Sequence, residues 1–540
     1  MSHKLRFAKR IPLPAAWVPA AAFCALFLHL FSCGGKSPLQ SGGEATVINI
    51  YMFASNETYR NVDQVIAEFE QQTRETLNID IRIHTMLRDD YLERIALIAS
   101  TGTEADLVFN APWMNLNSLI QKNVYKELSG YFDNPALSSL RSAFPPAFLD
   151  SNHFFGGIYG IPIMNAPLDI PGIYYRKDLA DAYGITIQSY DDLRFFFETI
   201  LREEKGMIPI SIQNNRGFYM MFDATWDMAA KGIYPIEGII GGVRELFFVG
   251  LSSDGKRVTG VSAYGDPEDS YTAYPNPYNT FEGFNRYFLE AAKWNVYVSE
   301  DSVMREQAGP LFFNGFAAAG EGAVSEFSRW QNTLKTHLPQ ASIAFWPYIE
   351  AARNREKGSI ALSFRAWNYL CVPRNSSKTE KVFEFLNWVF ESREHNDLFS
   401  YGIRGVHWNM ADDSSTPVPN PLLSEADRYL FPGYELTWNP RFIRIPAGLP
   451  EDVRSLFEYQ YAPDAFTRIP VSDFVLDDRE IISELANIRV ILKKYHNALL
   501  CGAYEDPAAI LREMNRQMEA AGLAKVKDAI VRQVQDYLDS

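Results

Sequence analysis

The hydrophobic pattern changes period several times in the first quarter of the chain. Residues 47–53 form a β-branched and aromatic run, and 79–83 alternates apolar with charged side chains, as strands do. Residues 61–72 between them carry apolar side chains at helical spacing. A helical pattern over 91–99 and a short apolar run at 107–109 follow. Strand, helix, strand, helix, strand predicts a parallel α/β sheet.

Further along, the same kind of pattern predicts other elements. Residues 246–263 indicate a hairpin whose turn is Asp254-Gly255, and 281–297 indicates a helix. From about Val471 the pattern is helical, with a helix start at Asp506-Pro507. The last 70 residues therefore predict a helical cap on one lobe of the protein.

The N-terminus combines a basic segment with an apolar one. Lys4, Arg6, Lys9 and Arg10 precede the apolar stretch 15–31, and the stretch closes on Leu30-Phe31-Ser32-Cys33. That order is typical of a secretory signal, and its end resembles a bacterial lipobox.

The segment therefore predicts a signal peptide over 1–32, lipidation of Cys33 and a Gly- and Ser-rich tether over 33–45. An uncleaved membrane anchor is the alternative, although the run is shorter than the roughly 20 residues that span a bilayer and Pro19 and His29 interrupt it. With lipidation, the rest of the chain lies outside the cytoplasm, facing the periplasm or the cell exterior.

Composition narrows the class of protein further. A length of 540 residues indicates two or more domains, and 47% hydrophobic residues indicate packed cores. A net charge of −15 disfavours nucleic acid as a partner. After Cys33 only Cys371 and Cys501 remain, and we expect two buried thiols in preference to a disulfide. The scattered histidines give no zinc spacing, so neither a metal nor a cofactor is expected.

Several later segments carry a family resemblance. Tyr159-Gly160-Ile161-Pro162 is followed by a Tyr-Tyr-Arg-Lys-Asp-Leu run at 174–179 and by Tyr190-Asp191-Asp192-Leu193. Together with the other matching segments, they resemble extracellular solute-binding proteins of carbohydrate ABC importers, in particular the larger lipoprotein members. The other segments are Phe312 to Gly322, Cys371-Val372-Pro373, Ser376 to Lys378, Phe385 to Trp388, Tyr401 to Trp408 and Pro507 to Leu538.

The resemblance implies a two-lobed α/β fold of the periplasmic-binding-protein type (type II) with a helical C-terminal extension. Ligand would lie in the cleft between the lobes, which close by hinge motion. The expected division is 46–166 plus 305–362 for lobe 1, 167–304 plus 363–470 for lobe 2, and 471–540 for the cap. The implied partners are a sugar or oligosaccharide, ABC permease subunits and, through the lipid, a membrane. We expect a monomer.

A sugar site needs flat aromatic faces and directional polar groups. Trp113 follows the strand ending at 109, where open α/β sheets bind ligands, although packing between lobes would also explain it. Trp367 and Asn368 lie at the last expected crossover. The remaining candidates have competing structural explanations: helix capping for Asn56 and for Glu321, which we expect at a helix start, core packing for Tyr175, and a weaker case for Trp226.

Two other functions stay open at this stage. A glycoside hydrolase or lyase needs only a suitably spaced pair of carboxylates, which no sequence of this kind excludes. None of the familiar catalytic motifs, such as GxSxG, a Walker sequence or HExxH, is present. A surface lipoprotein could also use the same fold for adhesion or scaffolding without feeding a transporter. The sequence favours a binding protein, not an enzyme.

Overall fold

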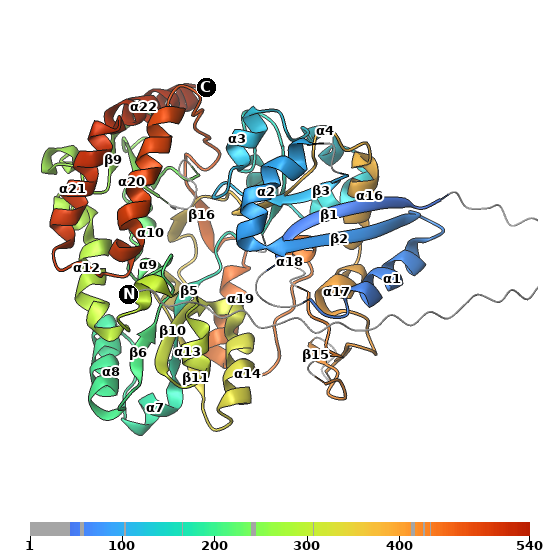
Figure 1. Ribbon diagram of the computed structural model, residues 1–540, viewed down its shortest axis with the longest axis horizontal. Helices are drawn as coiled ribbons and strands as arrows, with labels where there is room; N and C mark the ends of the chain where they lie inside the picture. Colours follow the sequence, from blue (N-terminus) through green and yellow to red (C-terminus); the bar gives the residue numbers. More distant parts are fainter. Residues whose placement is uncertain are drawn as a thin grey trace, which may run out of the picture. The chain divides into compact units, whose positions relative to one another are not determined.

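The computed structural model describes residues 44–54, 59–101, 104–164, 166–238, 245–305, 307–411, 416–424, 427–431 and 434–540. Five strands form the first sheet, in the order β2-β1-β3-β13-β4 (Figure 1). β1 runs parallel to β2 and β3, whereas β13 is antiparallel to β3 and β4. The strands are β1 (Thr46–Ala54), β2 (Ile79–Leu87), β3 (Leu107–Asn110), β4 (Ile161–Ile163) and β13 (Asn368–Cys371).

Helices cover the first sheet, and their apolar side chains share one core with it. Ile48, Ile50 and Leu107 on the strands and Phe69 and Phe385 on the helices are fully buried together. This arrangement explains why β3 is apolar on both faces. The helices of this lobe are α1 (Val62–Thr73), α2 (Arg88–Ser100), α3 (Leu116–Gln121), α4 (Ser129–Phe132), η1 (Pro135–Leu137), α5 (Ser138–Ser142), α6 (Pro146–Asp150), α16 (Thr379–Val389), α17 (Arg393–Tyr401) and α18 (Tyr434–Thr437).

The second sheet has four strands in the order β11-β5-β10-β6. β5 pairs antiparallel with both β10 and β11, and β10 runs parallel to β6. The strands are β5 (Pro171–Arg176), β6 (Ile208–Ser211), β10 (Ala317–Ala323) and β11 (Ile343–Pro347). The helices near it are α7 (Lys177–Ala182), α8 (Tyr190–Glu203), α13 (Gly309–Phe313), η5 (Val324–Glu326), α14 (Phe327–His337), α15 (Glu350–Asn354) and α19 (Glu451–Gln460).

The strand pairing corrects part of the expected lobe boundaries. Residues 305–362 were expected in lobe 1, yet β10 and β11 pair with β5 in the second sheet. Residues 363–470 were expected in lobe 2, yet β13 lies between β3 and β4 in the first sheet. Strand pairing between segments far apart in the sequence decides which sheet a strand joins. The sequence alone could not show this, because a short apolar run such as 317–319 is compatible with either sheet.

A third region packs beside the second sheet. Its sheet has the order β7-β8-β9, from β7 (Ile233–Pro235), β8 (Phe247–Leu251) and β9 (Val258–Ala263). The expected hairpin is confirmed, because β8 pairs antiparallel with β9 and Gly255 has a φ of 70° in the turn. The short helices here are α9 (Tyr219–Phe222), α10 (Thr225–Ala230), η2 (Glu268–Tyr271), α11 (Phe281–Phe284), α12 (Arg286–Trp294), η3 (Asn295–Tyr297) and η4 (Ser302–Met304).

Three long helices end the chain: α20 (Ile482–Leu500), α21 (Pro507–Ala520) and α22 (Leu523–Asp539). They share one core with β8, β9 and α12, in which Ile488, Leu511 and Val526 are buried against Phe248 and Phe288. In Figure 1 they form the red layer over the β9 region. These amphipathic helices therefore cap the third region, as their apolar spacing requires.

Two small strand pairs complete the described elements. β12 (Ile360–Leu362) pairs parallel with β16 (Phe466–Arg468), and β14 (Trp408–Met410) pairs antiparallel with β15 (Pro417–Pro419). The first pair joins two segments about one hundred residues apart in sequence. Among the described residues, every helix is too short or too polar to cross a membrane.

Candidate functional site

The crossover into β13 is the centre of the site. Residues 363–368, called the crossover below, connect β12 to β13. Asn152, fully buried after α6, accepts from the Ala366 amide at 2.7 Å and from the Tyr369 hydroxyl at 2.5 Å. Its amide also donates to the Phe364 carbonyl at 3.0 Å. One buried side chain thus fixes the backbone that carries Trp367 and Asn368.

Trp113 and Asn368 meet at the end of the first sheet. Trp113 Nε1 donates to Asn368 Oδ1 at 3.1 Å, and the Trp113 ring lies edge-on to Phe53 of β1 with centroids 6.3 Å apart. The turn that follows β3 brings Trp113 there, because Asn110 accepts from the next backbone amide at 2.7 Å. The expected candidates from two distant segments are therefore neighbours.

A shallow pocket lies beside Trp367, the neighbour of Asn368, and about 450 Å³ of space, open solvent included, falls within it. Trp226 on α10 and Trp367 on the crossover both line it, together with the carboxylates Glu237 and Glu245. Trp367 is 44% exposed, an unusual state for so large an apolar side chain in the described residues. The pocket thus offers two indole surfaces and carboxylate acceptors, the kind of groups that bind a sugar ring and its hydroxyls.

Glu245 is held in place from the neighbouring helix. It is 7% exposed, and the Tyr219 hydroxyl of α9 donates to its Oε2 at 2.9 Å. Nothing in the sequence singles out Glu237, Glu245 or Tyr219, since each lies in an unremarkable segment. The antiparallel pairing of β7 with β8 brings Glu237, which follows β7, and Glu245, which precedes β8, to the pocket.

Arg365 is a further residue that sequence reasoning passed over. It lines a smaller hollow of about 270 Å³ that adjoins the first pocket and shares Glu237 with it. Its guanidinium lies over the Phe154 ring at 4.8 Å, and Nη1 donates to the His153 carbonyl at 3.2 Å. Nη2 is buried and makes no hydrogen bond to any residue that the structure describes. Its position two residues before Trp367 was the available signal.

Two of the expected site residues lie elsewhere. Glu321 is not at a helix start but on β10, paired with Ile173, and it accepts from the Tyr348 hydroxyl at 3.1 Å. Burial raises the pKa of Glu321 to about 8. Tyr175 packs against Phe196 of α8 with ring centroids 6.0 Å apart, and burial raises its pKa to about 12. Neither residue lines the pocket.

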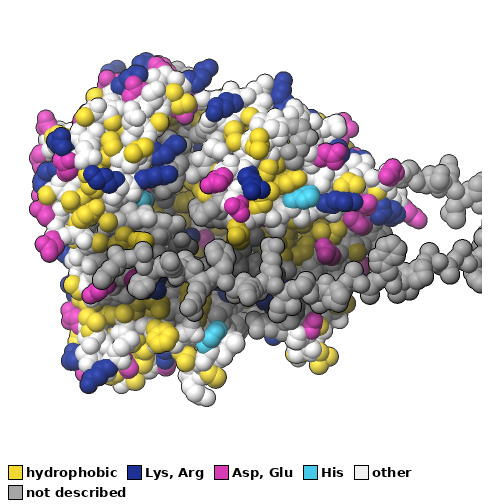
Figure 2. Space-filling view, viewed as in Figure 1, with side chains coloured by type: hydrophobic (Ala, Val, Ile, Leu, Met, Phe, Trp, Pro, Cys, Tyr) yellow, Lys and Arg dark blue, Asp and Glu magenta, His cyan; other side chains and the backbone are white. Residues whose placement is uncertain are grey.

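Asn56 and Cys33 lie outside the described residues. Cys371 and Cys501 are free, buried thiols, and burial raises the pKa of Cys501 to about 12. The expectation of two unbridged thiols is confirmed. Within the described ranges, no three His, Cys, Asp or Glu side chains come close enough to hold a metal ion. On the face shown in Figure 2, Lys and Arg side chains are interspersed with Asp and Glu.

Comparison with known proteins gives one relative over almost the full length. A carbohydrate ABC transporter substrate-binding protein of Streptococcus pneumoniae serotype 4 is 20% identical over 537 residues, which is 96% of this chain and 97% of the relative. Residues 470–539 match the family model described as Domain of unknown function (DUF3502). The resemblance expected from the sequence is therefore confirmed.

Solved structures share the fold at low sequence identity. The N-glycan transport solute binding protein (NgtS) of S. pneumoniae has a TM-score of 0.70 and 17% identity, over 92% of this chain and 99% of that one. Its complex with Man5GlcNAc has a TM-score of 0.65. The alginate-binding protein AlgQ2 has a TM-score of 0.60 and 13% identity, over 92% and 99% of the two chains.

The fold is thus the two-lobed, type II periplasmic-binding fold that the sequence predicted, with a helical C-terminal extension. The relatives in this comparison are substrate-binding proteins, so the expectation of a binding protein and not an enzyme is confirmed.

Proposed function

We propose that this protein is the substrate-binding component of an ABC importer and captures an oligosaccharide between its two lobes. Cys33, once lipidated, anchors the exported chain to a bacterial membrane, and the lobes close on the ligand by hinge motion. The tether keeps the loaded protein near permease subunits and so raises its effective concentration there. The protein acts as a monomer.

The observation that carries the proposal is the pocket between α10 and the crossover. Two tryptophans and two carboxylates from four separate segments line it, although they are up to 141 residues apart in the chain (Trp226 and Trp367). Indole faces bind the apolar face of a pyranose, and carboxylates accept from its hydroxyls. The whole-chain similarity to a carbohydrate transporter component supports the same function.

Calorimetric titration of the purified protein with neutral oligosaccharides tests this function. Man5GlcNAc is the first probe, because the similar protein NgtS was crystallised with it. We expect saturable binding, and we expect Trp367→Ala to weaken it by about tenfold or more, equal to about 1.4 kcal/mol. A panel of neutral and acidic oligosaccharides that all fail to bind would refute the proposal.

Phe316→Ala is the matched control for that substitution. Phe316 is 58% exposed and lies before β10, outside the pocket. Its truncation removes a similar exposed aromatic surface, so affinity should stay within about twofold of wild type. Equal losses in both variants would place the ligand elsewhere. Chromatography of the incubated sugar must show no shortened product, since turnover would indicate a glycan-active enzyme.

The anchor has its own test. Cys33→Ser should release the protein from the membrane fraction of expressing cells, while the mature chain keeps its affinity for ligand. Persistence of the variant in the membrane fraction would favour the uncleaved anchor over lipidation. Metabolic labelling with a fatty acid provides the direct readout of the modification.

A further inference from the structure

We propose that the C-terminal helices set the geometry of the ligand pocket through one irregular segment, residues 469–478, called the strap below. This inference assigns a role to the region that matches a domain of unknown function, and it rests on the proposed function. The strap follows β16 and precedes α20, without a helix or strand of its own. Its shape therefore depends on the side chains that hold it.

On one side the strap holds the crossover. Ser472, 1% exposed, accepts from the Phe364 amide at 2.8 Å through Oγ, and its carbonyl accepts from Ser363 Oγ at 3.4 Å. The Ile469 amide donates to the Leu362 carbonyl at 3.1 Å. These bonds begin at Leu362, five residues before Trp367, and flank the backbone that Asn152 fixes from the other side.

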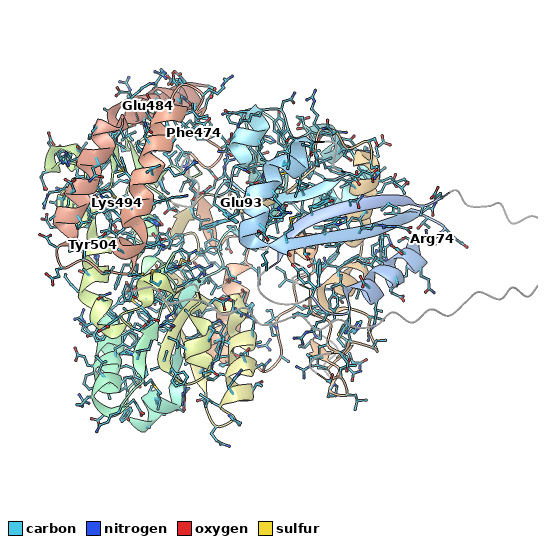
Figure 3. The ribbon with its side chains drawn as sticks, in the orientation of Figure 1. Arg74, Glu93, Phe474, Glu484, Lys494 and Tyr504 are labelled. Carbon is cyan, nitrogen blue, oxygen red and sulfur yellow. The ribbon has the colours of Figure 1, made fainter. Side chains whose placement is uncertain are left out.

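The strap also forms a wall of both hollows. Ile469 lines the larger pocket, and Val471, Ser472 and Phe474 line the smaller one with Arg365. Figure 3 shows Phe474 between the C-terminal helices and the lobe that carries α3. A shift of the strap would therefore change the pocket wall and the position of the crossover together.

On its other side the strap is held by α22. The Gln533 side chain bonds to the Asp477 backbone twice: Oε1 accepts from the amide at 2.8 Å, and Nε2 donates to the carbonyl at 2.9 Å. One turn further, the Tyr537 hydroxyl donates to Asp473 Oδ1 at 2.7 Å, and its ring lies edge-on to Phe474 at 5.8 Å. Gln533 and Tyr537 are thus positioning residues, with no contact to the pocket themselves.

The strap reaches the first lobe as well. Gln121 at the end of α3 donates to Asp477 Oδ1 at 3.4 Å, and Ser472 Oγ donates to Ser151 Oγ, after α6, at 3.1 Å. Val475 packs against the core of the first sheet, whereas Leu476 belongs to the core beneath the C-terminal helices. Movement of the first lobe relative to these helices must therefore displace the strap. The strap thus couples the position of the C-terminal helices to the position of the first lobe.

α22 itself supplies a matched control. Gln535 also makes two bonds to backbone, from the Val258 amide at 3.0 Å and to the Lys256 carbonyl at 3.1 Å, but these hold the β8–β9 turn and not the strap. Gln533 and Gln535 are both partly exposed on the same helix. Gln533→Met and Gln535→Met therefore remove equivalent bonds at similar cost to the helix.

Hydrogen exchange of the full mature chain without ligand is the first measurement. Gln533→Met should speed exchange across 361–368, including the Phe364 amide, whereas Gln535→Met should speed it only around 256–258. Tyr537→Phe, which keeps the ring on Phe474, should give a smaller change in the same direction. Unchanged exchange at 361–368 in both strap variants would overturn the inference, whatever the ligand.

Affinity for Man5GlcNAc, or for whichever oligosaccharide the wild type binds, is the second measurement. Gln533→Met should weaken binding by about tenfold, mainly through faster dissociation, and Gln535→Met by no more than about twofold. Equal losses of affinity in the two variants would show that only overall stability matters and would overturn the inference. If wild type binds no sugar, the proposed function fails, and the exchange experiment still decides whether the strap positions the crossover.

Discussion

Two polar sites on the large sheets differ in what covers them. Where β3 ends and β13 begins, Trp113 and Asn368 bond to each other and the adjoining Trp367 is 44% exposed at an open pocket. On β10, Glu321 is bonded to Tyr348, which is 6% exposed, and lies near Tyr287, which is 4% exposed. Candidate residues are therefore accessible at the end of the first sheet and buried on β10 of the second sheet.

The third region of the molecule covers Glu321. α9 packs on β5 and against α12, and α12 shares its core with the C-terminal helices. Gly217 sits so close to the Leu500 carbonyl that a Cβ would lie 2.1 Å from the oxygen, which shows how tightly the end of α20 meets the segment before α9. In this protein, access to a site on a sheet therefore depends on the third region and on the C-terminal helices that pack against it.

The largest expected effect concerns the contact of the C-terminal helices with the third region. Asp266 is fully buried, and it accepts from Lys527 of α22 at 2.6 Å and from Asn515 of α21 at 2.6 Å. Lys527→Met leaves that carboxylate without its cation, which should lower the free energy of unfolding by about 3–5 kcal/mol. Chemical denaturation measures the change.

Lys525→Met on the same helix is the control. The Lys525–Glu484 ion pair has an N–O distance of 2.7 Å, and the Lys525 side chain is 55% exposed. Loss of the pair should therefore lower the free energy of unfolding by no more than about 1 kcal/mol. Equal losses for the two lysines would mean that the buried pair does not hold the C-terminal helices on β9.

The next effect concerns Glu321 and appears as a pH dependence. Burial raises its pKa from 4.5 to about 8, so between these values the folded protein keeps a proton that the unfolded chain has released. Stability must therefore fall as pH rises through that window. Glu321→Gln should remove this fall and make the variant more stable than wild type at pH 8. The gain should be a few kcal/mol, because each tenfold change in proton concentration across the window is worth about 1.4 kcal/mol.

Thermal unfolding from pH 4 to pH 9 measures this prediction. Wild type and Glu321→Gln should differ least at pH 4, where both side chains are neutral in the folded and unfolded chain. Parallel curves would show that Glu321 is ionised and stabilised in the fold. Ligand affinity should not change in this variant, since Glu321 does not line the pocket.

The smallest expected effect concerns the accessible site at Trp113 and Asn368. Asn368→Leu removes the acceptor of the Trp113 indole, which should cost about 1 kcal/mol of stability and weaken oligosaccharide binding a few-fold. A shift of tryptophan emission on ligand addition reports whether the indole side chains of the site still respond to the ligand. Asn354→Leu, at the exposed end of α15, should leave both properties unchanged. Wild-type ligand affinity in Asn368→Leu would show that the hydrogen bond to Trp113 does not contribute to ligand binding.

Much of the fold could be predicted because it follows from local pattern. The strand and helix alternation of 47–109, the Asp254-Gly255 hairpin and the helices after 471 depend on side-chain periodicity and turn chemistry within a few residues. Glu321 was misplaced because Gly320 and Gly322 beside it remove the alternation that marks a strand. Its strand forms through pairing with β5, about 150 residues earlier.

The candidate site divides in the same way. Local sequence pattern was enough to predict the α/β class, the hairpin and the helical end, and it proposed the aromatic candidates Trp113 and Trp367, since each depends on neighbouring residues. The folded arrangement was needed to show which sheet β10, β11 and β13 join, that Trp226 and Trp367 share a pocket with Glu237 and Glu245, and that Arg365 lines the adjoining hollow. The physical reason is that pairing, burial and access arise between segments far apart in the chain, and local pattern carries no information about which of them meet.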